Sequence, residues 1–310
     1  MGGVNRVLMT ALLAPAALGG VQPAPSRLSI EGVWNFSTLT PLERPAEFAN
    51  RPVISDAEAA AWANSQIVRD DRDRRDGGAA LDVSRAVNDY WFDRGTALAR
   101  GRGGRMTSLI VDPPDGRMPA LTPAARTRVA AAAAAVREHP SDGPEDRSLQ
   151  ERCLSFNAGP PMLPGVYNNI VEIEEMPGYI VIFNEMIHDA RLVPLADSRR
   201  TPPVLRRWQG VPRGRWDGPT LVVDSTGFLQ PLNLRGADAE LHLIERFTPL
   251  DANTLLYSFT VDDATAYARP WTAEVPMTRT NDRIFEYACH EGNYALPDIL
   301  RGARYEDSHR

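Results

Sequence analysis

The chain has 310 residues, 43% of them hydrophobic, which is long and apolar enough for one large domain or two small ones. Its formal net charge of −6 argues against a nucleic-acid partner, because phosphate backbones are bound by basic surfaces. All 34 basic residues are Arg, and the missing lysine excludes Schiff-base chemistry, pyridoxal phosphate attachment and the Walker phosphate loop.

The first 25 residues predict a secretory signal peptide. An arginine precedes the apolar run 7–18, which is too short to span a bilayer, and small residues follow it. A buried N-terminal helix is the alternative, but Pro15 would interrupt it. We expect cleavage near residues 20–26 and one mature domain over 26–310, without a membrane span. The mature protein is then periplasmic or secreted.

Two helices and a strand pair are predicted in the first half of the chain. Ser55 and Glu58 form a capping box ahead of an alanine-rich stretch and predict a helix near 55–68. Segment 107–121 is typical of two strands joined by an Asp-Gly turn. A Thr-Pro pair then predicts the start of a second helix, near 122–138.

From about residue 166 the pattern changes to short strands joined by polar turns, which is typical of an antiparallel meander. So long a meander usually curls, because an open sheet exposes its edges. The predicted fold is therefore mainly β: an antiparallel barrel or meander of lipocalin or calycin type, with two or three accessory helices. The expected strands are 179–183, 191–195, 241–248, 254–261, 271–279 and 283–289, and segment 216–224 predicts a turn followed by a strand.

The sequence contains two cysteines, Cys153 and Cys289. Export would place them in an oxidising compartment, where two thiols commonly pair. A bond between them would stabilise the fold by about 4–5 kcal/mol on chain-entropy grounds, less any strain. Two separately buried thiols are the alternative, and both possibilities stay open.

The strongest candidate for catalysis is a group of ionisable residues directly after the strand 179–183. It contains Glu185, His188, Asp189 and Arg191. A histidine beside carboxylates can act as general acid or base, because its ordinary pKa is about 6.5. We expect His188 to move a proton, oriented by Asp189 or Glu185, while Arg191 stabilises developing negative charge. The alternative is a polar hairpin tip held by a salt bridge.

A second group surrounds Cys289 near the end of the chain. A bond to Cys153 would pin segment 287–291 beside segment 159–169 and give a substrate site a rigid wall. The alternative is a terminal strand with a structural disulfide. The expected substrate-binding residues are Tyr167, Asn169, Trp91, Tyr287, His290 and Glu291.

No metal or cofactor is expected. Three histidines, at 188, 242 and 290, would suit a zinc site, but their spacing matches no metal motif. The Gly-x-Ser-x-Gly, Cys-x-x-Cys and His-Glu-x-x-His motifs are absent from the sequence. His242 and Glu245 lie on opposite faces of one expected strand, so one points inward and needs a partner there. We expect His242 to face solvent.

Six segments of the chain have recognisable sequences: 91–95, 107–117, 184–191, 213–218, 270–274 and 285–294. They include Trp-Phe-Asp-Arg-Gly, Asn-Glu-Met-Ile-His-Asp-Ala-Arg and Glu-Tyr-Ala-Cys-His-Glu-Gly-Asn-Tyr. Together they resemble a large family of exported bacterial proteins of mostly unassigned function. The resemblance covers nearly the whole mature chain and implies a common architecture without a settled activity. The opening Gly32-Val33-Trp34 also resembles the Gly-x-Trp of lipocalin-type barrels, although the two inserted helices depart from a simple lipocalin.

Two functions fit these residues. The first is an exported, cofactor-free enzyme that uses His and carboxylate acid–base chemistry on a small molecule, aromatic ones included, as a lyase, isomerase or hydrolase. The second is a non-catalytic, lipocalin-like protein that holds a small apolar ligand inside the barrel. Convergence of Glu185, His188 and Asp189 with His290 on a concave pocket would favour the enzyme. A wholly apolar cavity, with His188 in solvent, would favour the binding protein.

Overall fold

The computed structural model describes residues 28–85, 88–157, 159–195, 205–229 and 234–309. The expected signal peptide, residues 1–25, lies outside these ranges. Nine strands form the main body: β1 (Gly32–Asn35), β6 (Ile170–Met176), β7 (Tyr179–Asn184), β8 (Asp189–Pro194), β9 (Val211–Asp217), β10 (Thr220–Thr226), β11 (His242–Pro249), β12 (Thr254–Asp262) and β13 (Trp271–Arg279).

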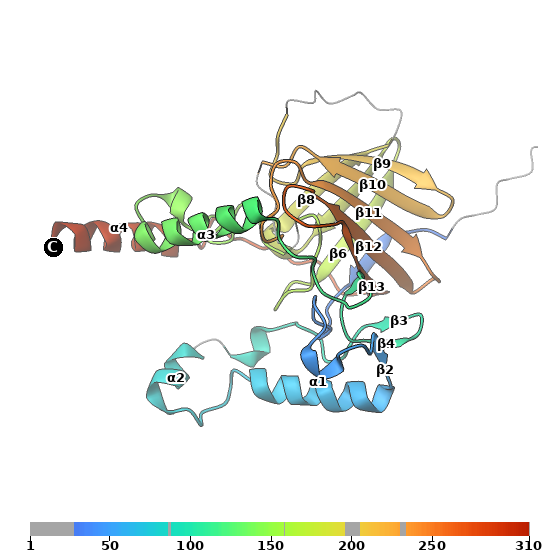
Figure 1. Ribbon diagram of the computed structural model, residues 1–310, viewed down its shortest axis with the longest axis horizontal. Helices are drawn as coiled ribbons and strands as arrows, with labels where there is room; N and C mark the ends of the chain where they lie inside the picture. Colours follow the sequence, from blue (N-terminus) through green and yellow to red (C-terminus); the bar gives the residue numbers. More distant parts are fainter. Residues whose placement is uncertain (1–27, 86–87, 158, 196–204, 230–233, 310) are drawn as a thin grey trace, which may run out of the picture.

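These strands follow the order β8-β7-β6-β1-β13-β12-β11-β10-β9, and every neighbouring pair is antiparallel. The sheet curls until Leu195, just after β8, bridges Gly214 of β9 in parallel (Figure 1). With nine strands one parallel contact is unavoidable, because an odd number cannot alternate in direction around a ring. The predicted antiparallel barrel with accessory helices is confirmed, and β8 and β9 form its one parallel seam.

The strands β8 and β9 are in close contact at one point of the seam and are not paired elsewhere. A Cβ atom on Gly214 would lie 2.9 Å from Val193 and 3.0 Å from Leu195, so glycine is what allows the two strands to touch. Within the described residues no other backbone pairing joins β8 to β9. Toward their first residues, Asp189 and Val211, the two strands are therefore free to separate.

The two ends of the barrel differ in their connections. Short turns join β6 to β7, β9 to β10 and β11 to β12 at one end. At the other end β8, β9, β11 and β13 begin, and the chain makes its longer connections. We call this second end the loop end. It is where polar side chains can enter the barrel without interrupting a tight turn.

Large side chains fill the interior of the barrel. Phe247, Tyr257, Phe259 and Trp271 are at most 1% exposed, and their rings form a chain of contacts with centroids 5.0–5.7 Å apart. Burying each such side chain stabilises the fold by about 1.5–3 kcal/mol. A barrel filled in this way is a packed core, unlike the ligand cavity that the lipocalin comparison implies.

Both predicted helices are present and begin where the sequence places them. The helix α1 (Asp56–Asp70) starts at Ser55, whose Oγ accepts from Glu58 N at 3.3 Å, and Ser55 N donates to the Glu58 carboxylate at 3.1 Å. The helix α3 (Pro123–Glu138) starts at Thr122, whose Oγ1 accepts from Ala125 N at 3.1 Å. The capping residues therefore determine both starts.

A second, small sheet lies beside α1. It pairs β2 (Val53–Ile54), β4 (Gly104–Met106) and β3 (Arg100–Gly101) in that order. Phe48, Ile54, Ala59, Ala63 and Leu98 make a hydrophobic core of their own here. The strand β5 (Ile110–Asp112) then returns to the barrel and pairs with β13.

Several features differ from the sequence expectation. Only Ile110–Asp112 of the strand pair expected in 107–121 forms a strand, and the strands β6 and β9 were not expected. Two further helices, α2 (Gly78–Ser84) and α4 (Ala295–Ser308), were not expected, and segment 283–289 is not a strand. The strand fails because β13 is already paired with β12 on one side and with β1 and β5 on the other. The chain after Arg279 therefore finds no free edge and leaves the barrel.

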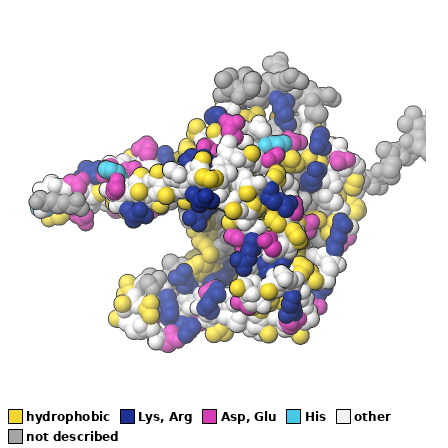
Figure 2. Space-filling model, in the orientation of Figure 1, with side chains coloured by type: hydrophobic (Ala, Val, Ile, Leu, Met, Phe, Trp, Pro, Cys, Tyr) yellow, Lys and Arg dark blue, Asp and Glu magenta, His cyan; other side chains and the backbone are white. Residues whose placement is uncertain are grey.

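The helices give the molecule its outline (Figure 1). The helices α3 and α4 project from one side of the barrel, while α1 and α2 lie below, and Figure 2 shows the surface hollowed between these two arms. Four short 3-10 turns complete the structure: η1 (Ala46–Phe48), η2 (Asp89–Trp91), η3 (Pro144–Asp146) and η4 (Met186–His188). Within the described ranges no helix has the length and apolar character needed to cross a membrane.

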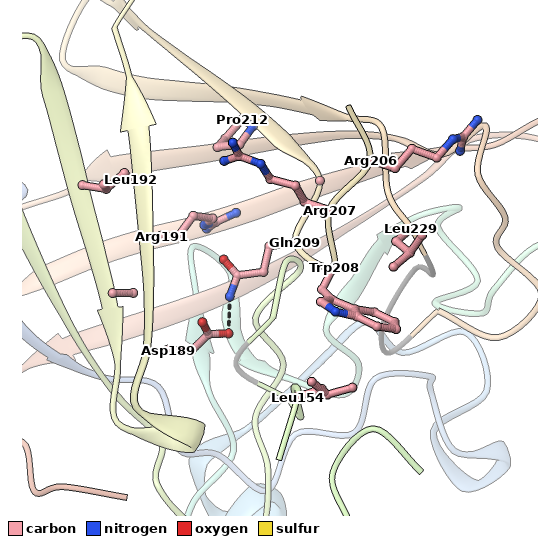
Figure 3. A pocket seen from close by; sticks show the side chains of 12 residues that line it. Leu154, Asp189, Arg191, Leu192, Arg206, Arg207, Trp208, Gln209, Pro212 and Leu229 are labelled. Carbon is pink, nitrogen blue, oxygen red and sulfur yellow. Dashed lines mark hydrogen bonds between the residues drawn. The ribbon is translucent and has the colours of Figure 1, made fainter. Parts of the chain in front are cut away.

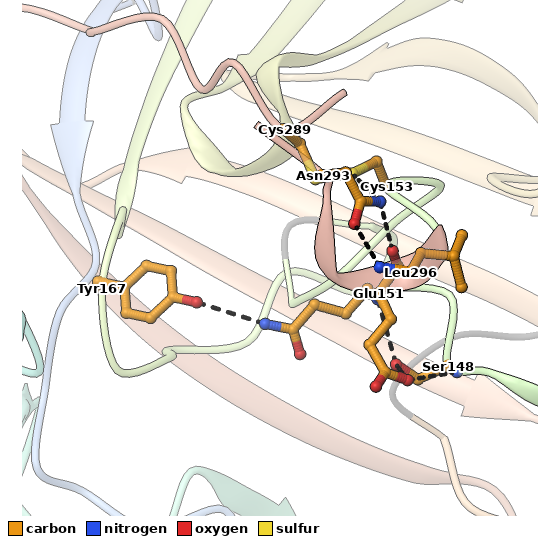
Figure 4. Close-up of a disulfide and its surroundings, with 8 residues drawn as sticks. Ser148, Glu151, Cys153, Tyr167, Cys289, Asn293 and Leu296 are labelled. Carbon is orange, nitrogen blue, oxygen red and sulfur yellow. Dashed lines mark hydrogen bonds between the residues drawn. A yellow bond between two sulfur atoms is a disulfide. The ribbon is translucent and has the colours of Figure 1, made fainter. Parts of the chain in front are cut away.

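Cys153 and Cys289 form a disulfide, with their Cα atoms 5.8 Å apart and a sequence separation of 136 (Figure 4). Of the two open alternatives, the bond is therefore the one observed. Asn293 adds a tie beside it, because its Nδ2 donates to the Glu151 carbonyl at 2.7 Å. A disulfide of this kind is consistent with a periplasmic or extracellular location.

Candidate functional site

A cavity of about 530 Å³ opens where β8 and β9 separate (Figure 3). We call it the seam cavity. One wall is the start of β8, and the other is segment 206–212, which leads into β9. Leu154 and Leu229 contribute from two further loops. Its size lies within the range of small-molecule sites, which is about 300–1,000 Å³.

Asp189 is the carboxyl group in this cavity. It starts β8 opposite Asn184 of β7, so its side chain lies on the inward face of the sheet. Gln209, from the opposite wall, donates its Nε2 hydrogen to Asp189 (Figure 3). Burial raises the pKa of Asp189, although this hydrogen bond and the charge of Arg191 oppose the shift. The carboxyl group therefore exchanges its proton nearer to neutral pH than an exposed aspartate does.

Arg191 lies two residues further along the same face and is only 4% exposed. Its Nη1 and Nη2 donate to the two carboxylate oxygens of Glu245 at 2.5 and 2.9 Å. Burial lowers the pKa of Arg191, but the charge and hydrogen bonds of Glu245 outweigh it and raise the pKa above its usual value. Arg191 thus offers the cavity a neutralised ion pair instead of the free cation that an oxyanion site needs.

The ion pair extends into the barrel. The Tyr257 hydroxyl donates to Glu245 Oε1 at 2.9 Å and accepts from Met162 N at 3.1 Å. Tyr257 is fully buried, and burial, followed by the charge of Glu245, raises its pKa well above the usual value. The wall behind Asp189 is therefore a rigid polar network in which Arg191, Glu245 and Tyr257 satisfy one another.

Glu245 and His242 lie on opposite faces of β11, as their spacing in the strand predicts. Glu245 is fully buried inside the barrel, whereas His242 lies on the outer face with its Nε2 3.0 Å from Asp224. The His242 side chain is 38% exposed. The expectation that His242 faces solvent is correct, and the partner that the inward Glu245 needed is Arg191.

His188 does not reach the cavity. It ends the tight turn η4 with a φ of 55°, and its backbone N donates to the Glu185 carbonyl at 3.0 Å. Phe183 alternates with the buried Ile182 and Asn184 and so lies on the outer face of β7, where the His188 ring packs edge-on against it with centroids 4.6 Å apart. The imidazole is exposed. The expected convergence of His188 with Asp189, Glu185 and His290 on one pocket is therefore not found.

Glu185 anchors the C-terminal segment. It is 5% exposed, and its Oε1 accepts from the backbone N of Phe285 at 3.1 Å. Asp93 lies close by, since burial and then the charges of Glu185 and Asp282 raise its pKa. Arg94 donates to the carboxylate of Asp89 and not to that of Asp93.

The expected substrate-binding residues lie outside the seam cavity. Asn169 is fully buried, and its Nδ2 donates to the carbonyls of Asp93 and Gly165 at 2.6 and 3.0 Å, which is a structural role. Trp91 is 67% exposed at the molecular surface. His290 and Glu291 are exposed as well.

Tyr287 and Tyr167 do come together. Burial and a hydrogen bond with Tyr167 raise the pKa of Tyr287 to about 12, and Gln150 Nε2 donates to the Tyr167 hydroxyl at 3.3 Å (Figure 4). Tyr287 and Gln150 line a second, more open cavity of about 860 Å³ beside the disulfide. The two groups of expected site residues are thus brought to separate places.

Segment 207–209 supplies cavity residues that sequence reasoning missed. Arg207, Trp208 and Gln209 all line the seam cavity. The available signal was a tryptophan in a polar loop, flanked by two arginines and by Gln-Gly, a position where a large aromatic side chain is not needed for a core.

Comparison of the chain with protein-family models, with curated proteins and with solved structures gave no significant match. The resemblance to exported bacterial proteins therefore stays a prediction. Among the described residues no group of three or more His, Cys, Asp or Glu side chains could hold a metal ion. The chemistry of the site is accordingly argued from its geometry.

The raised pKa of Asp189 predicts a pH dependence of stability. An unfolded aspartate has a pKa of about 3.9, so the folded protein binds this proton more tightly than the unfolded chain does. The resulting stabilisation is fully present below about pH 3.9 and is lost as the pH rises through the folded pKa. We expect the unfolding free energy of the wild type, relative to Asp189→Asn, to fall between pH 3.5 and 7. Urea unfolding of both proteins measures it, and a constant difference would contradict it.

Proposed function

We propose that the protein is an exported, cofactor-free acid–base enzyme that acts on a small molecule in the seam cavity, with Asp189 as the proton-transfer group. The carrying observation is that a carboxyl group with a raised pKa lines a cavity of small-molecule size. Perturbed carboxyl groups in concave sites are typical of general acids and bases. Asp189 thus takes the role that the sequence assigned to His188.

The surroundings of Asp189 support this role. Gln209 fixes the carboxylate from one side, and the Arg191–Glu245 pair sets a rigid wall on the other. A proton transferred by a carboxyl group in this setting suits a lyase, isomerase or hydrolase. Positioned groups of this kind contribute about 10²–10⁴-fold to rate.

The disulfide and the expected signal peptide support export. A stable bond between Cys153 and Cys289 needs an oxidising compartment, which the cytoplasm does not offer. Residues 1–25 have the three parts of a signal peptide. We therefore place the reaction in the periplasm or outside the cell.

A non-catalytic binding protein is the second candidate, and the apolar side chains of Leu154, Trp208 and Leu229 in the cavity favour it. Its ligand would lie in the seam cavity. The barrel interior, which is filled by residues such as Phe247 and Trp271, offers a ligand no comparable space.

Turnover assays of three variants test the proposal. A panel of small organic acids, esters and hydroxy compounds is incubated with the wild type, Asp189→Asn, His188→Ala and Asp217→Asn, and products are followed by NMR. Asp217 is an exposed carboxylate at the opposite end of the barrel and serves as a matched control. We expect Asp189→Asn alone to lose turnover, by about 10²-fold or more. Loss in His188→Ala with activity kept in Asp189→Asn would contradict the assignment, and binding without turnover in any protein would favour the second candidate.

A further inference from the structure

The seam cavity contains one arginine whose charge the described part of the protein leaves uncompensated. Arg206 lies 3.9 Å from the Glu240 carboxylate and donates its Nη1 to the carbonyls of Phe228 and Ala239, both at 3.2 Å, and Arg191 is neutralised by Glu245. Arg207, by contrast, has no side-chain acceptor among the described residues. Figure 3 shows Arg207 extending toward Pro212 on the Arg191 side of the cavity, whereas Arg206 extends in the opposite direction.

The other part of the cavity is apolar. Figure 3 places the Trp208 ring between Leu154 and Leu229, away from the polar group of Asp189, Gln209 and Arg207. An indole face beside two leucines favours a flat or branched apolar group. The cavity therefore has one cationic end and one apolar end.

We infer that the ligand of this cavity is a small monocarboxylate with an apolar or aromatic body. Its carboxylate pairs with the Arg207 guanidinium, whose planar fork matches a carboxylate in two parallel hydrogen bonds. Its body lies against Trp208, within the cavity that Asp189 also lines. The inference names the substrate class of the enzyme proposed above and rests on that proposal for the role of Asp189.

A single negative charge suits the site better than two. Asp189 lines the same cavity as Arg207, so a dianionic phosphate would place its second charge near a carboxyl group without another free cation to balance it. A bound monocarboxylate also favours the protonated form of Asp189, because a nearby negative charge raises the pKa of a carboxyl group further. Binding of the ligand and protonation of Asp189 are thus coupled, which suits a general acid.

Matched pairs of probes test the ligand class. Acetate, phenylacetate, 3-phenylpropanoate and 2-naphthylacetate are each compared with the corresponding primary amide, and dissociation constants are measured by ligand-observed NMR up to millimolar concentration. In the wild type we expect the aromatic carboxylates to bind at least tenfold more tightly than their amides, because charge-assisted hydrogen bonds to arginine are about twice as strong as neutral ones. Acetate, which lacks the body, is expected to bind most weakly.

Two arginine variants show which arginine causes the preference for carboxylates over amides. Arg207→Gln is expected to bring each carboxylate within about twofold of its amide, whereas Arg206→Gln, a change of the same kind at the neighbouring position, keeps the preference. Trp208→Leu is expected to weaken both members of each aromatic pair. Equal binding of acid and amide in every pair, absence of binding by all probes, or loss of the preference in Arg206→Gln alone would overturn the inference.

Asp189→Asn separates this inference from the proposed function. Carboxylate preference that persists in Asp189→Asn, together with unchanged turnover, would support the ligand class and contradict the enzyme mechanism. Turnover that depends on Asp189 but acts equally on acids and amides would support the enzyme mechanism and contradict the ligand class.

Discussion

Replacement of Glu245 by alanine is expected to destabilise the folded protein by about 3–5 kcal/mol. The Arg191 guanidinium is 4% exposed and makes its two charged hydrogen bonds to Glu245, so the variant leaves a buried cation without its hydrogen-bonded counter-ion, and only the charge of Asp189 still acts on it among the carboxylates that influence its pKa. Tyr257 loses its acceptor at the same time. Guanidinium chloride unfolding, followed by tryptophan fluorescence, measures the loss.

Two control variants show whether the loss comes from the unpaired charge. The double variant Arg191→Met/Glu245→Leu removes both charges and is expected to recover most of the stability, because apolar replacements of buried pairs are often neutral. Arg269→Ala breaks an exposed pair with Asp112, half-exposed on both sides, and is expected to cost less than about 1 kcal/mol. A double variant as unstable as Glu245→Ala would contradict the explanation.

Removal of the disulfide is expected to have an effect of similar size. The variant Cys153→Ser/Cys289→Ser opens a loop that spans 136 positions, and the chain-entropy argument gives up to about 5 kcal/mol for a loop of that length. The C-terminal segment would then be held to the rest of the protein by weaker ties, such as Phe285 N to Glu185. Unfolding by denaturant measures the global change, and hydrogen exchange of segment 285–294 measures the local one.

The barrel itself serves as the internal reference for this variant. We expect the amides of β11 and β12 to exchange only through global unfolding, whereas the C-terminal segment exchanges faster than the barrel. Chemical reduction of the wild type should reproduce the behaviour of the double serine variant. A change in unfolding free energy below about 1 kcal/mol would show that the bond contributes little to this fold.

The sequence predicted those strands and helices that carry a clear local signal, which is alternation of apolar residues for a strand and a capping residue for a helix. The strands β11 to β13 alternate buried and partly buried residues along most of their length, and both predicted helices carry a capping residue. The helix α4 had a weaker signal of the same kind, with apolar residues at 296, 299, 300 and 303 on one face. Segment 283–289 was misassigned because its pattern is correct for a strand while its would-be partner β13 has both edges occupied.

The candidate site was predicted only in part, and the reason is topological. Asp189 and Arg191 line the cavity as one face of a strand requires, whereas His188 ends the turn before that strand and packs against Phe183 instead. The cavity itself exists because nine strands close with one parallel seam at Gly214. That closure brings Arg207 and Trp208 to Asp189 from a distant loop, and no local pattern in either segment encodes their meeting.

Fluorine NMR of the protein labelled with 5-fluorotryptophan tests most directly that the seam cavity is the functional site. The chain has six tryptophans, and Trp208 is identified by the resonance that disappears in Trp208→Leu. On titration with 2-naphthylacetate the account predicts a saturable shift of the Trp208 resonance, with the buried Trp34 and Trp271 unchanged. Saturable shifts of Trp91, Trp34 or Trp271, with Trp208 unaffected, would place the ligand elsewhere and contradict it.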